Sequence, residues 1–352
     1  MFLLRILVFL FGVGLVARAL LSAVRTFVLP RSARDGVTRT VFLTVRWFFN
    51  LRLRRANSYV DRDRVMAFYA PVGLLLLPGV WLALVLLGYM GIFWAFGVQP
   101  WPAAFTLSGS SLLTLGFALA KDWPTTVLAF SEAAIGLILV ALLISYLPTM
   151  YTAFSRREAA VTMLEVRAGS PPSAVEMLAR FHRLHRLSKL SELWEEWEVW
   201  FVELEETHTS LAALAFFRSP QADHSWVTAA GAVLDAAALT RSVVDTPLDR
   251  QADLCIRAGY LALRRIAEYF TIDYDPDPAP DDPISIGRDE FEAACEELAS
   301  QGVPLVANRE QAWRDFAGWR VNYDTVLLAL AALTMAPYAP WSSDRSLRLP
   351  PS

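Results

Sequence analysis

Cysteine and histidine are scarce in this sequence. Cys255 and Cys295 are the only cysteines among 352 residues, and they lie far apart with no C-x-x-C spacing. This usage argues against a disulfide framework and against a cysteine-based zinc site. His182 and His185 have helical spacing but no evident third ligand, so no metal site is expected.

Catalytic and nucleotide-binding motifs are also missing. No phosphate-binding loop or dinucleotide fingerprint occurs, and the serine, histidine and aspartate residues stand at no catalytic spacing. We therefore expect no enzyme activity, no cofactor and no nucleic-acid partner. The net charge of −3 indicates little about partners, because its sign differs between segments.

Charge is absent from the long stretch Val65–Ala120. Its 56 residues are too many for one membrane crossing, which takes about 20 apolar residues. They are too few for two crossings joined by an ordinary water-facing loop. The whole chain is 55% hydrophobic with a mean hydropathy of +0.37, which indicates a membrane protein.

The second half of this stretch, from Trp101 to Ala118, organises the interpretation of the chain. Pro100, Pro102 and Gly109 interrupt it. The pattern predicts one full crossing, then a short helix that dips into the membrane, then non-helical chain that leads back out. Non-helical backbone is tolerated at membrane depth only where protein buries it or where it lines a watery path. The stretch therefore predicts a pore.

The five residues Thr114, Leu115, Gly116, Phe117 and Ala118 resemble the selectivity filter of the potassium-channel family, usually Thr-Val-Gly-Tyr-Gly. The resemblance covers about Met66–Ser155 and implies one quarter of a homotetrameric pore. It implies an outer helix near 66–96, a pore helix near 102–113 and an inner helix near 124–154. Filter carbonyls would coordinate dehydrated monovalent cations, with potassium the expected ion.

The sequence departs from the family pattern at four positions. Ala118 replaces a glycine, which would cost about 1 kcal/mol if the residue needs a positive φ. Phe117 lacks the hydroxyl of the usual tyrosine, and Leu113 and Leu119 replace the usual threonine and aspartate. Strict potassium selectivity therefore does not follow, and weakly selective cation permeation is an alternative.

Residues around this segment carry further expectations. Glu132 either hydrogen-bonds a pore-helix serine behind the filter or pairs with Lys121 at the mouth. The candidate serines are Ser108, Ser110 and Ser111, of which we expect Ser110 and Ser111 to support the filter. Gly136 lies near the family's hinge glycine, and Pro148 either shapes a gate by kinking the inner helix or makes a harmless bend.

The flanks of the apolar segments set an orientation. Residues 1–30 read as an N-terminal transmembrane helix, although Ala17-Arg18-Ala19 also mimics a signal-peptide cleavage site. The segment 31–65 contains nine arginines against three aspartates, and the positive-inside rule places it in the cytoplasm. A retained first helix with its N-terminus outside satisfies that rule. Within the segment, 37–49 predicts an amphipathic helix that lies in the membrane interface or packs on protein.

The chain beyond Ser155 reads as a helical cytoplasmic domain. We expect helices over 173–207, 223–239, 248–270, 288–300 and 308–335. The pore module is assigned to 66–155, the helical domain to 156–271, an acidic proline-rich linker to 272–287, and C-terminal helices with a loosely held tail to 288–352. The segment from His208 to Ser242, with Arg218, is either a pocket for an unidentified ligand or ordinary alanine-rich helix packing.

Together these features predict an all-α membrane protein of the bacterial inner membrane. Lys121 and Lys189 are the only lysines among 32 basic residues, a bias that fits a GC-rich bacterial source. The expected function is a homotetrameric cation channel in the lipid bilayer, gated or assembled by its cytoplasmic domain. The alternative is a non-conducting membrane anchor for a signalling or scaffolding domain.

Overall fold

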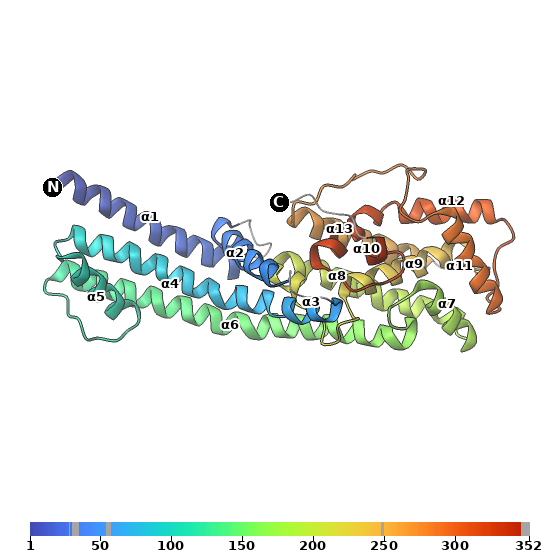
Figure 1. The fold of residues 1–352 in the computed structure, drawn as a ribbon, viewed down its shortest axis with the longest axis horizontal. Helices are drawn as coiled ribbons and strands as arrows, with labels where there is room; N and C mark the ends of the chain where they lie inside the picture. Colours follow the sequence, from blue (N-terminus) through green and yellow to red (C-terminus); the bar gives the residue numbers. More distant parts are fainter. Residues whose placement is uncertain (28, 30–34, 54–57, 248–249, 346–352) are drawn as a thin grey trace. The chain divides into compact units, whose positions relative to one another are not determined.

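The computed structural model describes residues 1–27, 29, 35–53, 58–247 and 250–345. All regular elements within those ranges are helices (Figure 1), which confirms the all-helical class. Three of them are long and apolar enough to cross a membrane: Phe2–Phe27, Tyr59–Ala95 and Trp123–Ala168. Parts of the expected arginine-rich segment, 30–34 and 54–57, and the end of the tail, 346–352, lie outside the described residues.

The chain divides into two compact units. The first comprises Met1–Ala56 and Val65–Thr152, and the second comprises Asn57–Arg64 and Ala153–Ser352. Helix α6 (Trp123–Ala168) runs from the first unit into the second without a break. It is therefore longer than the expected inner helix, which was to end near residue 154.

Helices α1 (Phe2–Phe27) and α4 (Tyr69–Ala95) of the first unit pack closely through glycines. A Cβ atom added to Gly12 would lie 2.5 Å from the carbonyl oxygen of Gly88, so only glycine permits this approach. The indole of Trp81 donates a 2.8 Å hydrogen bond to the hydroxyl of Ser22. Small residues and interhelical hydrogen bonds of this kind hold helices together in lipid, where apolar burial gives no driving force.

Helix α2 (Gly36–Leu53) covers the expected 37–49 helix and packs on α4. Val41 and Val45 are buried, and the ring of Phe42 lies 5.9 Å from that of Tyr69. The other side of α2 leaves large apolar side chains exposed: Leu43, Trp47, Phe48 and Leu51. The helix is therefore apolar on two sides, only one of which is covered within the unit.

The second unit is a bundle built around α9 (Trp226–Ser242). Its alanine-rich sequence is buried at nearly every position, which lets neighbouring helices approach closely. Around it lie α7 (Ala174–Arg183), α10 (Arg250–Tyr269), α12 (Arg309–Arg320) and α13 (Asp324–Thr334). The remaining elements are α3 (Tyr59–Met66), η1 (Leu187–Lys189), α8 (Leu190–Ser210), η2 (Ala212–Phe216), α11 (Arg288–Ser300) and η3 (Ser343–Arg345).

The single helix expected over 173–207 is wrong. The chain forms α7, then η1, then α8, with a break after Leu184. The amide of Arg186 donates to the carbonyl of Phe181 and that of His185 to the carbonyl of His182, which is the Schellman closure. His185 occupies the left-handed position with φ of 54°, where glycine is usual, so no glycine marks this helix end.

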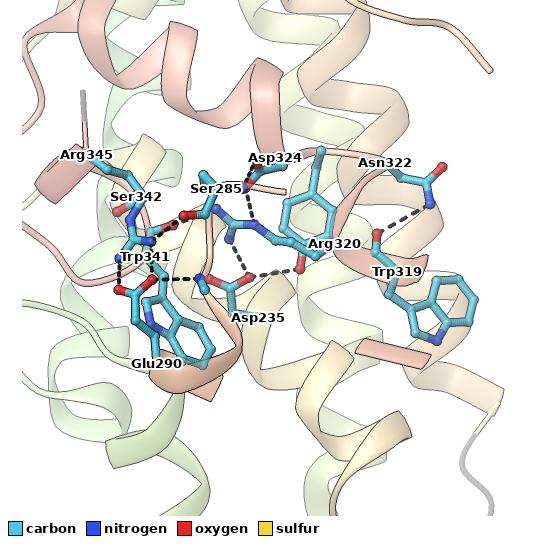
Figure 2. A network of polar contacts seen from close by, with 12 residues as sticks. Asp235, Ser285, Glu290, Trp319, Arg320, Asn322, Asp324, Trp341, Ser342 and Arg345 are labelled. Atoms are coloured by element: carbon cyan, nitrogen blue, oxygen red, sulfur yellow. Dashed lines mark hydrogen bonds and ion pairs between the residues drawn. The ribbon is translucent and has the colours of Figure 1, made fainter. Parts of the chain in front are cut away.

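The single helix expected over 308–335 is also wrong, because it divides into α12 and α13 at Val321–Tyr323. The residues on each side of the division, Arg320 and Asp324, join in a buried polar network (Figure 2). Fully buried Arg320 donates to Asp235 at 2.6 Å, to Asp324 at 2.7 Å and to the carbonyl oxygen of Trp341 at 2.6 Å. Burial lowers the pKa of the Arg320 guanidinium, but the two carboxylates outweigh it and raise that pKa above its usual value.

The same network corrects the expectation of a loose tail for residues 341–345. Trp341 is held through its carbonyl, and Ser342 is 1% exposed. Arg345 donates to both carboxylate oxygens of Glu290 and to the carbonyl oxygen of Ser285 (Figure 2). This part of the tail is a fixed part of the second unit.

Candidate functional site

The candidate site lies in the first unit, where α5 (Trp101–Leu112) is followed by the segment 113–122. The observed α5 begins and ends one residue before the expected 102–113, with Pro102 in its first turn, where the missing N–H costs nothing. It packs on α4: the ring of Trp101 stacks on that of Trp94 at 4.8 Å, and Ser108 donates to the carbonyl of Leu86 at 3.0 Å. Twelve residues rise about 18 Å, roughly half of the hydrocarbon core.

The segment 114–118 is non-helical and is held to α5 by its own amides. Leu115 donates to the carbonyl oxygen of Ser110 at 2.9 Å, and Gly116 donates to the same oxygen at 3.4 Å. The amide of Ala118 donates to the Ser110 hydroxyl at 3.0 Å. One serine of α5 therefore accepts from three of the five amides of the segment.

These bonds also determine where the carbonyls point. In a planar trans peptide the C=O and the N–H point in opposite directions. Because the amides of Leu115, Gly116 and Ala118 face Ser110, the carbonyls of Thr114, Leu115 and Phe117 point away from α5. Across the described residues, no hydrogen bond is donated to any of these three carbonyl oxygens.

The backbone conformation differs from the expectation at one position. Positive φ occurs at Thr114, at 54°, and at Gly116, at 72°, whereas Ala118 is not among the positive-φ residues of the described chain. The replacement of glycine by Ala118 therefore carries no left-handed strain. That strain falls on Thr114 instead, where a β-branched residue adopts it only at some cost.

Large apolar side chains of the same segment are uncovered in a single chain. Leu115 is 60% exposed, Phe117 66% and Leu119 83%. Soluble monomers rarely leave such apolar patches open. The segment therefore presents carbonyl oxygens without donors in the described chain, together with apolar side chains. We expect lipid or other copies of the chain to bury those side chains.

The supporting residues fall into two groups. Ser108, at 0% exposure, donates a 2.5 Å hydrogen bond to Glu132 Oε1, so the expected contact between Glu132 and a pore-helix serine is made, and Lys121 is not its partner. Ser110 contacts the segment directly, as described above. The Ser111 hydroxyl does not, because it donates to the carbonyl of Leu107 in its own helix; Ser111 reaches the segment only through its carbonyl, which accepts from the Thr114 amide at 3.0 Å.

The two expected gating residues lie within one unbroken helix. Helix α6 passes through both Gly136 and Pro148. A Cβ atom added to Gly136 would lie 2.4 Å from the carbonyl oxygen of Leu112, the last residue of α5. Gly136 is therefore a close-contact glycine that lets α6 reach the end of α5.

Two observations in the described part of the second unit bear on the possible ligand pocket. Arg218, considered above as a pocket residue, is occupied by Asp63, Tyr59 and two carbonyls. A described cavity beside His224 measures about 10 Å³, enough for one water molecule. His185 lies beyond the end of α7, so it does not share a helical face with His182.

Comparison of the chain with protein-family models, with curated proteins and with solved structures finds no match.

Proposed function

We propose that four copies of this chain form a cation channel whose 114–118 segments meet around a central axis. The observation that carries the proposal is the direction of the Thr114, Leu115 and Phe117 carbonyls, away from α5 and without hydrogen-bond donors in the described chain. At membrane depth such oxygens cost several kcal/mol each unless something pairs with them. A dehydrated cation on a shared axis would be that partner.

The surrounding helices support the same proposal. The C-terminal end of α5 leads directly into the segment, so its dipole favours a cation nearby. Among the three candidate spans, α6 is the least covered within one chain, with 17% of its most apolar window buried. Both the segment and α6 thus leave apolar surface for neighbouring subunits.

The proposed location is a bacterial inner membrane. Helix α1 is retained in this proposal, because the Gly12–Gly88 approach and the Trp81–Ser22 bond would be lost if it were cleaved. The arginines of 31–65 place that segment in the cytoplasm. The permeant ion is a monovalent cation, with potassium as the first candidate.

The decisive experiment compares two glycine variants in proteoliposomes. Gly116 and Gly97 both have positive φ, 72° and 102°, and a Cβ atom would meet nothing within 4 Å at either site. Gly116→Ala and Gly97→Ala therefore impose similar backbone strain of about 1 kcal/mol, but only the first lies in the proposed filter. We expect wild type and Gly97→Ala to carry potassium flux and Gly116→Ala to lose most of it.

The oligomeric state is measured on the same samples by native mass spectrometry, with four chains expected. Absence of cation flux in intact wild-type tetramers would reject conduction and favour the membrane-anchor alternative. Equal flux through both glycine variants would reject the 114–118 segment as the ion path.

A further inference from the structure

One short segment of the second unit, Leu214–Arg218, is held from two sides by arginines. On the first side, Arg157 of α6 donates to the carbonyl oxygens of Leu214 at 2.8 Å and Phe217 at 2.7 Å. Its side chain is 3% exposed and pairs with Glu158 at 2.7 Å. Phe154, one turn earlier, packs against Phe217 with ring centroids 5.9 Å apart.

On the second side, Arg218 itself binds α3. Its Nη1 donates to Asp63 Oδ1 at 3.0 Å and to the hydroxyl of Tyr59 at 3.1 Å. The same guanidinium donates to the carbonyls of Thr334 at 2.7 Å and Met335 at 2.9 Å, at the end of α13. The side chains of Arg218 and Asp63 are 11% and 12% exposed, so their ion pair is largely shielded from solvent.

The contacts on the two sides of this segment belong to two helices that continue into the first unit. Asp63 lies in α3, which leads directly into α4, and Arg157 lies on α6, which continues without a break from the first unit. The two helices that enter the first unit are thus tied, within the second unit, to residues no more than four apart in sequence. Breaking the largely shielded Arg218–Asp63 pair would leave a charge without its partner, so the contact resists a small displacement of α3.

We propose that Leu214–Arg218 is a mechanical clasp that couples α3–α4 to α6, so that a shift of either helix is transmitted to the other. The proposal gives the cytoplasmic unit a specific route for regulating the pore, and in that respect it rests on the proposed function. The clasp acts through the carbonyls of Leu214 and Phe217 on one side and the side chain of Arg218 on the other.

The first test is hydrogen exchange on the full-length protein in detergent, which does not depend on conduction. Asp63→Asn keeps the shape of the side chain and removes its charge. The residue that Asp63 pairs with is Arg218, not a residue of α6, so an effect on α6 would have to pass through the clasp. We expect faster amide exchange in 214–217 and also in the 157–168 part of α6. The control is Asp253→Asn, which breaks the half-buried Arg241–Asp253 pair elsewhere in the same unit and should speed exchange only around α9 and α10.

The second test is potassium flux in proteoliposomes. Asp63→Asn and Arg218→Gln should each change the flux rate by about 5-fold or more, with an unchanged potassium-to-sodium ratio. The double variant should match Arg218→Gln, because removing the guanidinium already breaks the contact with Asp63, and Asp253→Asn should behave as wild type.

Two results would overturn the clasp. One is an exchange change in Asp63→Asn that stops within α3. The other is wild-type flux that Asp63→Asn and Arg218→Gln leave unchanged or alter independently. A wild-type protein that carries no flux would count against the pore proposal, and the exchange test would still decide whether the clasp exists.

Discussion

Arg320 shows how much of the second unit depends on a single side chain. It is the last residue of α12, lies at 0% exposure, and joins Asp235 of α9, Asp324 of α13 and the carbonyl of Trp341. The hydroxyl of Tyr323 adds a 2.9 Å bond to Asp235. Removing the guanidinium would leave two buried carboxylates without a cation. Uncompensated buried charges of this kind strongly destabilise the folded state.

We therefore expect Arg320→Gln to lower the unfolding free energy of the second unit by about 3–5 kcal/mol. The measurement is urea unfolding of the full chain in detergent, followed by tryptophan fluorescence. Arg314→Gln is the control, because the Arg314–Glu310 pair is 66% and 58% exposed and should contribute less than about 1 kcal/mol. If Arg320→Gln lowers the unfolding free energy by less than about 1 kcal/mol, the network adds little stability.

His208 gives the unit a pH dependence. It is fully buried, its Nδ1 donates to the carbonyl of Leu204 at 2.9 Å, and its Nε2 accepts from Arg157 at 3.2 Å. Burial, followed by the nearby Arg157 charge, holds the pKa of His208 well below its usual 6.5. The folded protein thus keeps a neutral ring, whereas the unfolded chain binds a proton below pH 6.5.

Because the unfolded chain binds this proton and the folded protein does not, lowering the pH favours unfolding. Stability is complete above pH 6.5 and falls as the pH drops below it, by at most about 1.4 kcal/mol per pH unit. We expect His208→Gln to flatten this slope between about pH 6.5 and 5, measured as the melting temperature of the protein in detergent. His185→Gln, at an exposed position beyond α7, should retain the wild-type slope. An identical slope in His208→Gln would assign the effect to other groups.

At the scale of elements, the sequence predicted several helix ends marked by proline or glycine, but the change of polarity near residue 154 did not end α6, which continues to Ala168. The ranges 102–113 and 288–300 are reproduced to within one residue by α5 and α11. It failed where helix ends carried no such mark, after Leu184 and at Val321–Tyr323. There the ends are set by His185 in a left-handed conformation and by the burial of Arg320 and Asp324, which are tertiary effects.

Parts of the candidate site were also predictable from the sequence. Order and spacing located the 114–118 segment, because apolar runs are visible in a sequence. A bond from Glu132 to a pore-helix serine was one of two alternatives, and the sequence did not single out Ser108 from Ser110 and Ser111. The separate roles of Ser110 and Ser111 were not predictable, since both lie in one turn of α5 and differ only in which carbonyl or amide they reach. The two carbonyls that Arg157 binds, those of Leu214 and Phe217, lie far along the chain, so no local sequence pattern predicts these contacts.

The contact between α5 and α6 yields a prediction about Gly136. An alanine there would place Cβ 2.4 Å from the carbonyl of Leu112, whereas Gly79 of α4 has nothing within 4 Å of its Cβ position. Gly136→Ala should push α6 from the end of α5, costing about 1–3 kcal/mol by overpacking. We expect a lower melting temperature in detergent together with reduced flux.

Gly79→Ala should instead be neutral or slightly stabilising, since alanine is the better helix former. The pair of variants separates a packing glycine from a hinge glycine. A hinge would allow Gly136→Ala to keep full thermal stability while its open probability changes.

At the scale of the whole molecule, the number of crossings fixes the sides on which the chain ends lie. The apolar helices Phe2–Phe27, Tyr59–Ala95 and Trp123–Ala168 are each long enough to span. Helix α5, with 12 residues and a length of about 18 Å, is too short for a core of about 30 Å. If all three of these helices cross, the first and last described residues lie on opposite sides of the membrane.

The arginines of α2 and of the start of α3 then decide which side is which. If they face the cytoplasm, residue 1 is external and the helical second unit is internal. We expect a cysteine introduced at Phe2 to react with a membrane-impermeant maleimide in intact cells, and one introduced at Asp344 to react only after lysis. The native Cys255 and Cys295 are buried, so they should add little background. Labelling of both positions from the same side would have two explanations. Either α1 does not cross the membrane, or α5 and the segment after it form a fourth crossing. A fourth crossing would remove the re-entrant geometry on which the proposed ion path depends.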